Sequence, residues 1–145
     1  MPNSLQAEMA RFNHLNAEID AAYHDAALKL GLSDSAMLIL YTICSNGDSC
    51  LLSDITRLSG VSKQTINSAL RKLESQEIVY LEAAGGHKKK VCLTDQGKVL
   101  TEQTVQRIIA MENEIFGSWE PQEWALYVEL TQRYLTAFKE KVKTL

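Results

Sequence analysis

The sequence predicts a mainly α protein with one small β-hairpin (α+β), because two hydrophobic periodicities alternate along it. Over most of the 145 residues, apolar side chains recur at three- and four-residue steps, which is typical of amphipathic helices. Only residues 78–81 and 91–93 are β-prone runs, and a glycine pair lies between them. The chain is therefore expected to be a set of helices that carries a hairpin near its centre.

The first two helices have clear limits. The first covers residues 5–30, and Gly31 ends it. Ser33 can cap the second helix, which ends at Asn46-Gly47. The second helix carries the apolar residues Leu38, Ile39 and Ile43.

Two shorter helices follow, and a tight turn joins them. Ile55 and Leu58 are expected to point inward from the first, and Gly60 ends it because glycine adopts a positive φ at little cost. Ser62 can cap the second by accepting from the amide of Thr65. The inward face of that second helix carries Ile66, Ala69, Leu70 and Leu73.

The hairpin completes a recognisable order of elements. Its strands are Ile78 to Leu81 and Val91 to Leu93, and its tip is expected to carry Gly85-Gly86-His87-Lys88-Lys89-Lys90. Two short helices followed by a basic hairpin form a winged helix-turn-helix. This arrangement puts one helix in a DNA groove and a basic loop beside it.

The helices at the two ends of the chain have wide apolar faces. Asp95 is expected to open a long helix, and Pro121 suits the first turn of a final one. Two readings stay open: these helices cover the core of one subunit, or they interlock with a second copy. We expect the second, because a wide apolar arc needs two burial partners. The apolar residues concerned are Leu5, Met9, Phe12, Ile19, Tyr23, Ala26 and Leu30 near the start, Val105, Ile108, Ile109, Met111, Ile115 and Phe116 after Asp95, and Trp124, Tyr127, Val128, Tyr134, Leu135, Phe138 and Val142 in the last helix.

These elements predict one domain over residues 1–145. Within it, residues 32–94 form the winged helix-turn-helix, and residues 1–31 and 95–145 form a helical dimerisation region. A chain of this length can bury one ordinary core.

The charge distribution favours a polyanionic partner. The whole chain has 15 basic and 18 acidic residues and a net charge of −3. Residues 53–94 hold seven basic and four acidic residues, a net of +3, which leaves −6 for the remainder. Such a split concentrates the attraction for DNA on one region.

Composition argues against several other classes of protein. No apolar run approaches the roughly 18 residues that span a bilayer, and no signal-peptide core is present, so a cytoplasmic protein without membrane contact is expected. Neither the cysteines Cys44, Cys50 and Cys92 nor the three histidines have metal-ligand spacing, so no metal or other cofactor is expected. Motifs for a nucleophilic serine, a P-loop or a dinucleotide are also missing, and we do not expect an enzyme.

The candidate DNA contacts lie on the second short helix and on the hairpin tip. Amides can pair with the edge of adenine, so Gln64 and Asn67 are the expected base readers. The residues expected to contact phosphates, some of them also used in capping, are Ser62, Lys63, Thr65, Ser68 and Arg71 on the helix and His87, Lys88, Lys89 and Lys90 on the hairpin. The alternative is a winged helix used as a protein-interaction module, in which both surfaces are merely solvated.

Two segments resemble the MarR family of bacterial transcriptional regulators. Gly60 to Glu74, GVSKQTINSALRKLE, looks like the family's turn and recognition helix, and Val91 to Lys98, VCLTDQGK, looks like its second wing strand with the usual V-x-L-T-x-x-G pattern. The resemblance covers essentially the whole chain. It implies a homodimer that binds a pseudo-palindromic operator in double-stranded DNA, a repressor being expected, with occupancy modulated by a small ligand.

The chain departs from the family at three places. An Asp-Arg-Arg motif is common in the wing, where this chain has Gly85-Gly86-His87 followed by lysines. Glycine is usual after the recognition helix, where this chain has Glu77, and Ser68 replaces a common arginine. Since lysine lacks the planar fork that suits a narrow minor groove, the wing is expected to add affinity more than sequence reading.

The resemblance also implies where an effector would bind. Family members often take small aromatic or acidic molecules between the dimer helices and the winged helix. The candidates for a small aromatic or hydrophobic effector here are His14, Tyr23, His24, Met37 and Tyr41. A peroxide-sensing branch uses a cysteine on the first helix, which this chain lacks. Cys44 or Cys50 is the remaining redox alternative, although nothing nearby in sequence supplies a cation that would activate a thiol.

Overall fold

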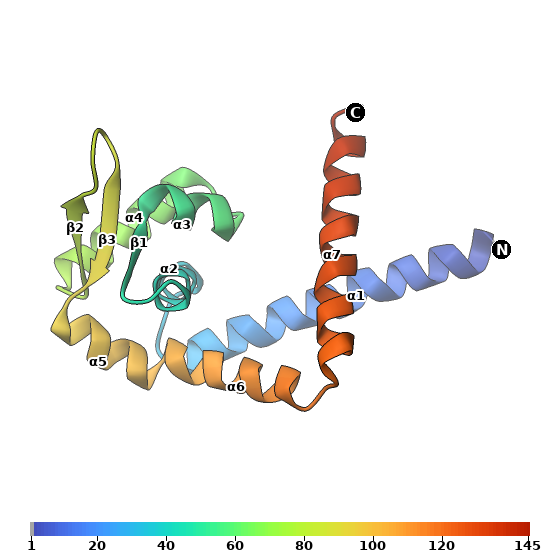
Figure 1. Ribbon diagram of the computed structural model, residues 1–145, viewed down its shortest axis with the longest axis horizontal. Coiled ribbons are helices and arrows are strands. Elements are labelled where there is room, and N and C mark those ends of the chain that lie inside the picture. Colours follow the sequence, from blue (N-terminus) through green and yellow to red (C-terminus); the bar gives the residue numbers. More distant parts are fainter. Residues whose placement is uncertain (1) are drawn as a thin grey trace. The chain divides into compact units, whose positions relative to one another are not determined.

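A computed structural model describes residues 2–145, with side chains from Ser4 onward. The chain divides into two compact units, Met1–Gln106 and Arg107–Leu145, and each is described by itself. In chain order (Figure 1) the elements are α1 (Pro2–Lys29), α2 (Asp34–Ser45), β1 (Ser49–Leu51), α3 (Leu52–Ser59), α4 (Lys63–Ser75), β2 (Val79–Ala83), β3 (Lys89–Leu93), α5 (Asp95–Gln103), α6 (Val105–Gly117) and α7 (Pro121–Val142). The predicted fold class, helical with a β-hairpin wing, is confirmed.

The core of the first unit lies between α2, α3, α4 and the sheet. Its fully buried large side chains are Ile39, Leu40, Ile43, Ile55, Ile66, Val79, Val91 and Val105. One inward expectation was wrong: Leu58 is 57% exposed. Because α3 makes only two turns, Ile55 in its middle fills the contact with the core, while Leu58 lies in the last turn at the surface.

The sheet has one strand more than the sequence predicted. Its order is β1-β3-β2, and both pairs are antiparallel. Strand β1 pairs Cys50 with Val91, and its three residues are too few for an alternating pattern to be recognised in the sequence.

The hairpin tip is also shorter than predicted. The N–H of Lys88 donates to the Gly85 carbonyl at 3.0 Å, which closes the loop. Lys89 and Lys90 are already strand residues of β3, paired with Ala83 and Glu82. The lysine run therefore begins in the loop and continues down the strand.

The predicted helix caps are confirmed. The hydroxyl of Ser33 accepts from the amide of Ala36 at 3.1 Å, and that of Ser62 accepts from the amide of Thr65 at 3.2 Å. Gly60 ends α3 with φ +69°, in the left-handed region that favours glycine. These local signals set the start of α2, the end of α3 and the start of α4.

The long helix expected from Asp95 is in fact two. It breaks at Thr104, where φ is −127° and ψ is −95°. The Thr104 side chain is buried, and its hydroxyl donates to the Leu100 carbonyl at 2.8 Å. A β-branched residue that packs inward and bonds back to the preceding turn favours such an interruption.

In the second unit, four aromatic rings join α6 to α7. The ring centroid of Phe116 lies 5.0 Å from that of Trp119 and 6.2 Å from that of Tyr127, and Trp124 stacks on Phe116 at 6.4 Å. These contacts fill the corner between the two helices.

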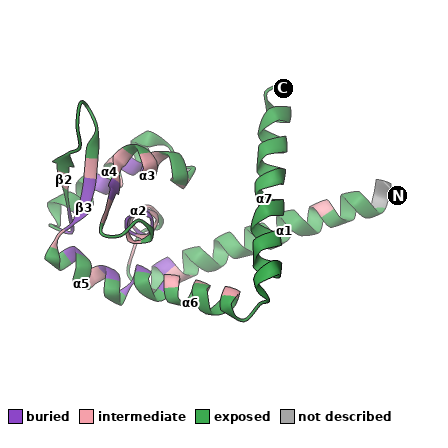
Figure 2. Cartoon of the chain, viewed as in Figure 1, coloured by how far each residue is buried: buried purple, intermediate pink, exposed green. Residues whose placement is uncertain are grey.

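Two helices remain almost entirely exposed. Helix α7 buries none of its residues, and nearly all described side chains of α1 up to Asp25 are exposed (Figure 2). Large apolar side chains among them include Leu5, Leu15 and Ile19 on α1 and Val128, Leu135 and Phe138 on α7.

Within residues 2–145 no single helix is both long enough and apolar enough to cross a membrane. Only Ser4–Lys29 and Asp34–Ser45 taken together, with a 93° bend between them, reach the required length and composition.

Candidate nucleic-acid interface

The orientation of α4 is fixed by its buried face. Ile66, Leu70 and Leu73 lie within the core at exposures of 5% or less. Their spacing of three and four residues places them on one side of the helix. The opposite side of α4 must therefore face away from the core.

That opposite side carries the residues predicted to contact DNA. Gln64, Ser68 and Arg71 are exposed, and Asn67 is half-buried, at helical spacing along one face. Lys63 is exposed at the start of the helix. The face therefore presents two amides, which can hydrogen-bond base edges, and a hydroxyl and two cations, which can bind phosphates.

Ser62 and Thr65 are largely used within the protein. The Ser62 hydroxyl donates to the hydroxyl of Thr65 at 2.8 Å and accepts the Thr65 amide. These bonds satisfy the first turn of α4, where backbone donors lack helical partners. Both side chains are exposed, but their main task is to begin the helix.

The register of the wing separates the lysines that follow the loop. Side chains alternate between the faces of a strand, so Lys89 shares the core-facing side of β3 with Val91 and Leu93. Lys90 lies on the other side, opposite Glu82. Of the two strand lysines, Lys89 therefore lies on the side of the hairpin that faces the core and Lys90 on the other side, while His87 and Lys88 lie in the loop.

The cations of this region are available for a ligand. Elsewhere, Arg57 pairs with Asp54 at 2.9 Å and Lys98 with Asp48 at 3.8 Å. Throughout the described part of the chain, no carboxylate oxygen lies within 4.0 Å of the charged nitrogens of Lys63, Arg71, Lys88, Lys89 or Lys90. Unneutralised cations on α4 and on the wing make this the electropositive side of the first unit.

The end of α4 is a Schellman motif. The N–H of Glu77 donates to the Glu74 carbonyl and that of Ile78 to the Leu73 carbonyl, both at 3.0 Å. Glu77 has φ +63°, the left-handed conformation that glycine adopts most readily. The position where relatives usually have glycine thus keeps the backbone conformation of glycine although the residue is glutamate.

Thr94 and Gly97 join this helix end to the wing. The Thr94 hydroxyl donates to the Glu77 carbonyl at 2.6 Å and accepts the amide of Gly97 at 2.9 Å. The Thr94 amide donates to the Ile78 carbonyl at 3.1 Å. Sequence reasoning identified both residues only as part of a family pattern. The signal for the role of Thr94 was its place before a helical run, where threonine is a good cap.

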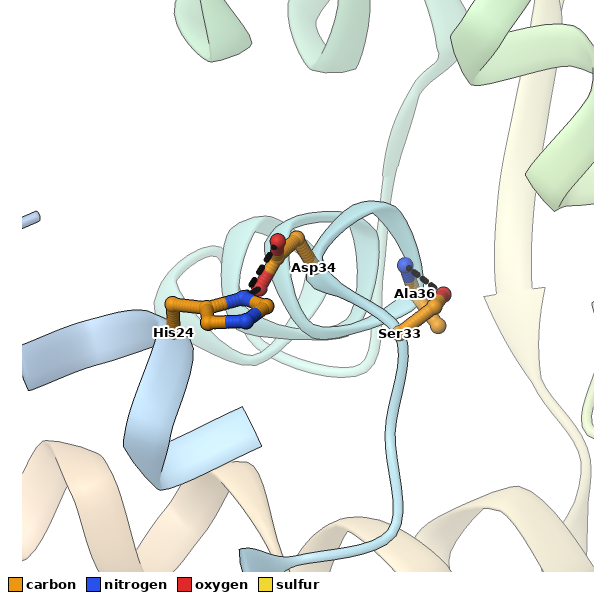
Figure 3. A network of polar contacts seen from close by, with 4 residues as sticks. All are labelled: His24, Ser33, Asp34 and Ala36. Atoms are coloured by element: carbon orange, nitrogen blue, oxygen red, sulfur yellow. Dashed lines mark hydrogen bonds and ion pairs between the residues drawn. The ribbon is translucent and has the colours of Figure 1, made fainter. Parts of the chain in front are cut away.

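The effector candidates do not gather at one point. His24 on α1 pairs with Asp34 at the start of α2, with its Nδ1 2.8 and 2.9 Å from the two carboxylate oxygens (Figure 3). His14 lies about 15 Å away along α1, because a helix rises about 1.5 Å per residue. Tyr23 is exposed next to His24, whereas Met37 is buried in the core and Tyr41 is half-buried against it.

The thiols lie in protected surroundings. Burial raises the pKa of Cys50 to about 11, with a smaller contribution from the Asp54 carboxylate. Burial also raises the pKa values of Cys44 and Cys92. Thiols that stay protonated are weak nucleophiles, so these side chains have the character of packed apolar groups. Among residues 2–145, no three His, Cys, Asp or Glu side chains are placed to hold a metal ion.

The geometry matches solved regulators of one family. The MarR_2 family model, described as "MarR family", matches residues 30–90. The MarR family regulator NMB1585 from Neisseria meningitidis superposes with a TM-score of 0.80 at 16% identity, over 95% of this chain and 99% of that one. MepR from S. aureus, solved in its DNA-binding conformation, superposes with a TM-score of 0.74 at 17% identity, over 90% and 98%. NadR, solved in complex with 4-hydroxyphenylacetate, superposes with a TM-score of 0.70 at 13% identity, over 86% and 89%.

Among curated protein sequences, none matches the chain significantly. At identities this low, the superpositions show the fold alone. The sequence match to the family lies on the helix-turn-helix and most of the wing. The fold and that match agree with the resemblance of Gly60 to Glu74 and Val91 to Lys98. Residues 30–90 of the chain match the MarR family model, and its fold is that of solved MarR family transcriptional regulators.

Proposed function

We propose that this protein is a homodimeric, sequence-specific DNA-binding transcriptional regulator that acts as a repressor. The observation that carries the proposal is the outward face of α4, where Lys63, Gln64, Asn67 and Arg71 lie beside a basic wing. In helix-turn-helix proteins the second helix enters the major groove and reads base edges through such side chains. The structure of MepR in its DNA-binding conformation, which has the same fold, supports this use of α4.

A second copy of the chain is the partner that the exposed helices fit best. Helix α7 is 22 residues long and none of its residues is fully buried, and α1 exposes a row of large apolar side chains. Leu5, Phe12 and Ile19 on α1 are spaced seven residues apart, which favours packing against another helix. Apolar faces of this extent need a cover, and a two-fold dimer would cover the same face of both copies.

A two-fold dimer predicts the form of the operator. Its two recognition helices would read half-sites about one helical turn apart in a pseudo-palindrome. Gln64 and Asn67 would contact bases, and Lys63, Ser68 and Arg71 would contact phosphates, with Lys88 and Lys89 gripping the backbone from the wing.

Two measurements test this function together. Light scattering is expected to give the mass of a dimer at micromolar concentration. Retention on DNA is expected to weaken steeply as salt rises, because bound phosphates release counterions. A monomer, or DNA retention that is absent at low salt, would instead favour a winged helix used as a protein-interaction module.

A small aromatic or hydrophobic effector is the regulator we propose. NadR, which has the same fold, has been solved in complex with 4-hydroxyphenylacetate. His24 and Tyr23 lie where α1 meets the start of α2, and Met37 and Tyr41 lie one and two turns further along α2. A ligand among these residues would change the separation of the two recognition helices.

A screen of phenolic acids for release of bound DNA tests the effector proposal. Release by a phenolic acid, weakened in Tyr23→Ala, supports it. Release by peroxide that disappears in Cys44→Ser or Cys50→Ser would replace the ligand with the thiols.

A further inference from the structure

One side chain, Thr94, hydrogen-bonds both to the end of α4 and to the start of α5 at the base of the wing. We propose that Thr94 is a positioning residue for DNA recognition, which fixes the recognition helix relative to the wing. This inference rests on the DNA-binding function proposed above. Thr94 lies at the opposite end of β3 from the wing loop, so the role proposed for it does not depend on a contact with DNA.

The first step of the argument is where the Thr94 hydroxyl bonds. Its oxygen lies 2.6 Å from the Glu77 carbonyl and 3.1 Å from the Ile78 carbonyl, so Glu77 accepts the shorter hydrogen bond. Both carbonyls belong to the segment that leaves α4. That segment has the left-handed backbone at Glu77, so its carbonyls point out of the helix and need a partner from elsewhere.

The second step is that the same oxygen begins α5. It accepts the amide of Gly97 at 2.9 Å, and so serves as the N-cap of that helix. One hydroxyl therefore has two separate tasks: as a donor it holds the end of α4, and as an acceptor it begins α5.

The third step is that the segments at the junction pack in direct contact. A β-carbon built on Gly97 would overlap the Ile78 carbonyl oxygen and lie 3.3 Å from a methyl group of Leu93. The last rung of the wing, Val79 paired with Leu93, adjoins the same point. The end of α4, the base of the wing and the first turn of α5 thus meet in direct contact.

This contact bears on recognition because α4 and the wing must engage one duplex together. Base pairing by Gln64 and Asn67 requires correct placement of α4 in the groove, whereas phosphate contacts tolerate small shifts. Loss of the bond from Thr94 to Glu77 would leave a helix end free to tilt. Discrimination between DNA sequences would fall more than overall affinity.

Three substitutions separate the two tasks of the hydroxyl. Thr94→Ser keeps the donor and the acceptor. Thr94→Asp keeps a good cap for α5, but an ionised carboxylate only accepts and cannot donate to Glu77. Thr94→Val removes both functions at nearly constant shape. Thr42→Val is the matched control, because the buried Thr42 hydroxyl donates at 2.8 Å within α2, to Leu38, away from the junction.

The measured quantity is the ratio of dissociation constants for two duplexes at one salt concentration. One duplex is selected by the wild-type protein from a random library, and the other is a scrambled duplex of the same composition. We expect Thr94→Asp and Thr94→Val to reduce this ratio about tenfold, comparable to the loss of one base contact, while Thr94→Ser and Thr42→Val keep it. If Thr94→Val does not fold, Thr94→Asp carries the test alone.

Other outcomes overturn the proposal. If Thr94→Asp keeps the wild-type ratio, the threonine serves only as a helix cap. If Thr94→Asp and Thr94→Val lower the melting temperature alone and the ratio stays constant, its role is structural. Failure of the wild-type protein to distinguish the two duplexes would overturn the DNA-binding function itself, and this role of Thr94 with it.

Discussion

Gly97 in the first turn of α5 faces the carbonyl of Ile78 so closely that any β-carbon at position 97 would overlap the oxygen. The glycine is required by this approach and not by its own backbone, since its φ lies outside the left-handed range. This explains in physical terms why a glycine follows the threonine of the V-x-L-T-x-x-G pattern by three residues.

Gly97→Ala is therefore expected to destabilise the protein by about 1–3 kcal/mol, the usual cost of overpacking a filled site. Urea denaturation gives the free energy of unfolding. Gly117→Ala is the matched control: a β-carbon there meets nothing within 4 Å, and alanine is the better helix former. Equal stability of the two variants would contradict the close contact.

Glu77→Gly is expected to have the opposite effect. A residue with a β-carbon in the left-handed conformation costs roughly 1–2 kcal/mol, part of which glycine returns through its freer unfolded chain. A gain of about 1 kcal/mol in the free energy of unfolding is expected. The neighbouring Gln76, with φ −82°, provides the contrast: Gln76→Gly should lose stability. A loss in both variants would rule out strain at Glu77.

The wing lysines are expected to act unequally. Replacing Lys88 and Lys89 together by alanine should lower the dependence of log affinity on log salt by about two units, one for each lost phosphate contact. Lys90→Ala removes the same charge from the other face of the strand, which Lys90 shares with its cross-strand partner Glu82, and should leave that slope nearly unchanged. Salt titrations of DNA binding measure all three proteins. If Lys90→Ala lowers the salt dependence as much per lysine as the double variant does, the face of the strand does not decide which lysines contact phosphates.

Gln64→Ala is expected to relax specificity at one base pair by about 1–3 kcal/mol, because an amide can bond both N6 and N7 of adenine. Binding to duplexes changed at single positions measures this. Lys63→Ala serves as the comparison, since loss of a phosphate contact should weaken all sequences alike. A uniform weakening by Gln64→Ala would remove it from the base readers.

The Cys50 thiol is expected to resist alkylation. Its pKa is raised from 9.0 to about 11, so at pH 8 it holds roughly 100-fold less thiolate than an ordinary cysteine. Reaction with iodoacetamide should therefore be slow in the folded protein and fast in urea, and should accelerate as pH rises toward 11. Equal alkylation rates with and without urea at pH 8 would leave redox sensing open.

The raised pKa of Cys50 also predicts that the free energy of unfolding falls as pH rises from 9 through 11, because the thiol loses its proton at lower pH in the unfolded chain than in the folded protein.

Much of the fold could be predicted because its signals are local. The cap at Ser62, the turn at Gly60 and the start of α7 at Pro121 each depend on one residue and its near neighbours. The buried face of α4 followed from helical spacing alone.

What sequence could not predict depends on contacts between distant segments. Strand β1 exists only through its pairing with β3, and the break at Thr104 depends on how that side chain is buried. Lys89 and Lys90 point to different sides because both are paired with β2 as strand residues. The run of three lysines in the sequence does not show where the loop ends and the strand begins. The junction of Thr94 with Glu77 joins residues 17 positions apart.

Selection of binding sites from a random DNA library by the wild-type protein tests the central claim most directly. The account predicts enrichment of an inverted repeat with half-sites about one helical turn apart, bound by two copies of the chain per duplex. Recovery of no common sequence, at a salt concentration where DNA is retained, would contradict sequence-specific recognition by α4. An enriched single half-site bound by one copy would contradict the dimer.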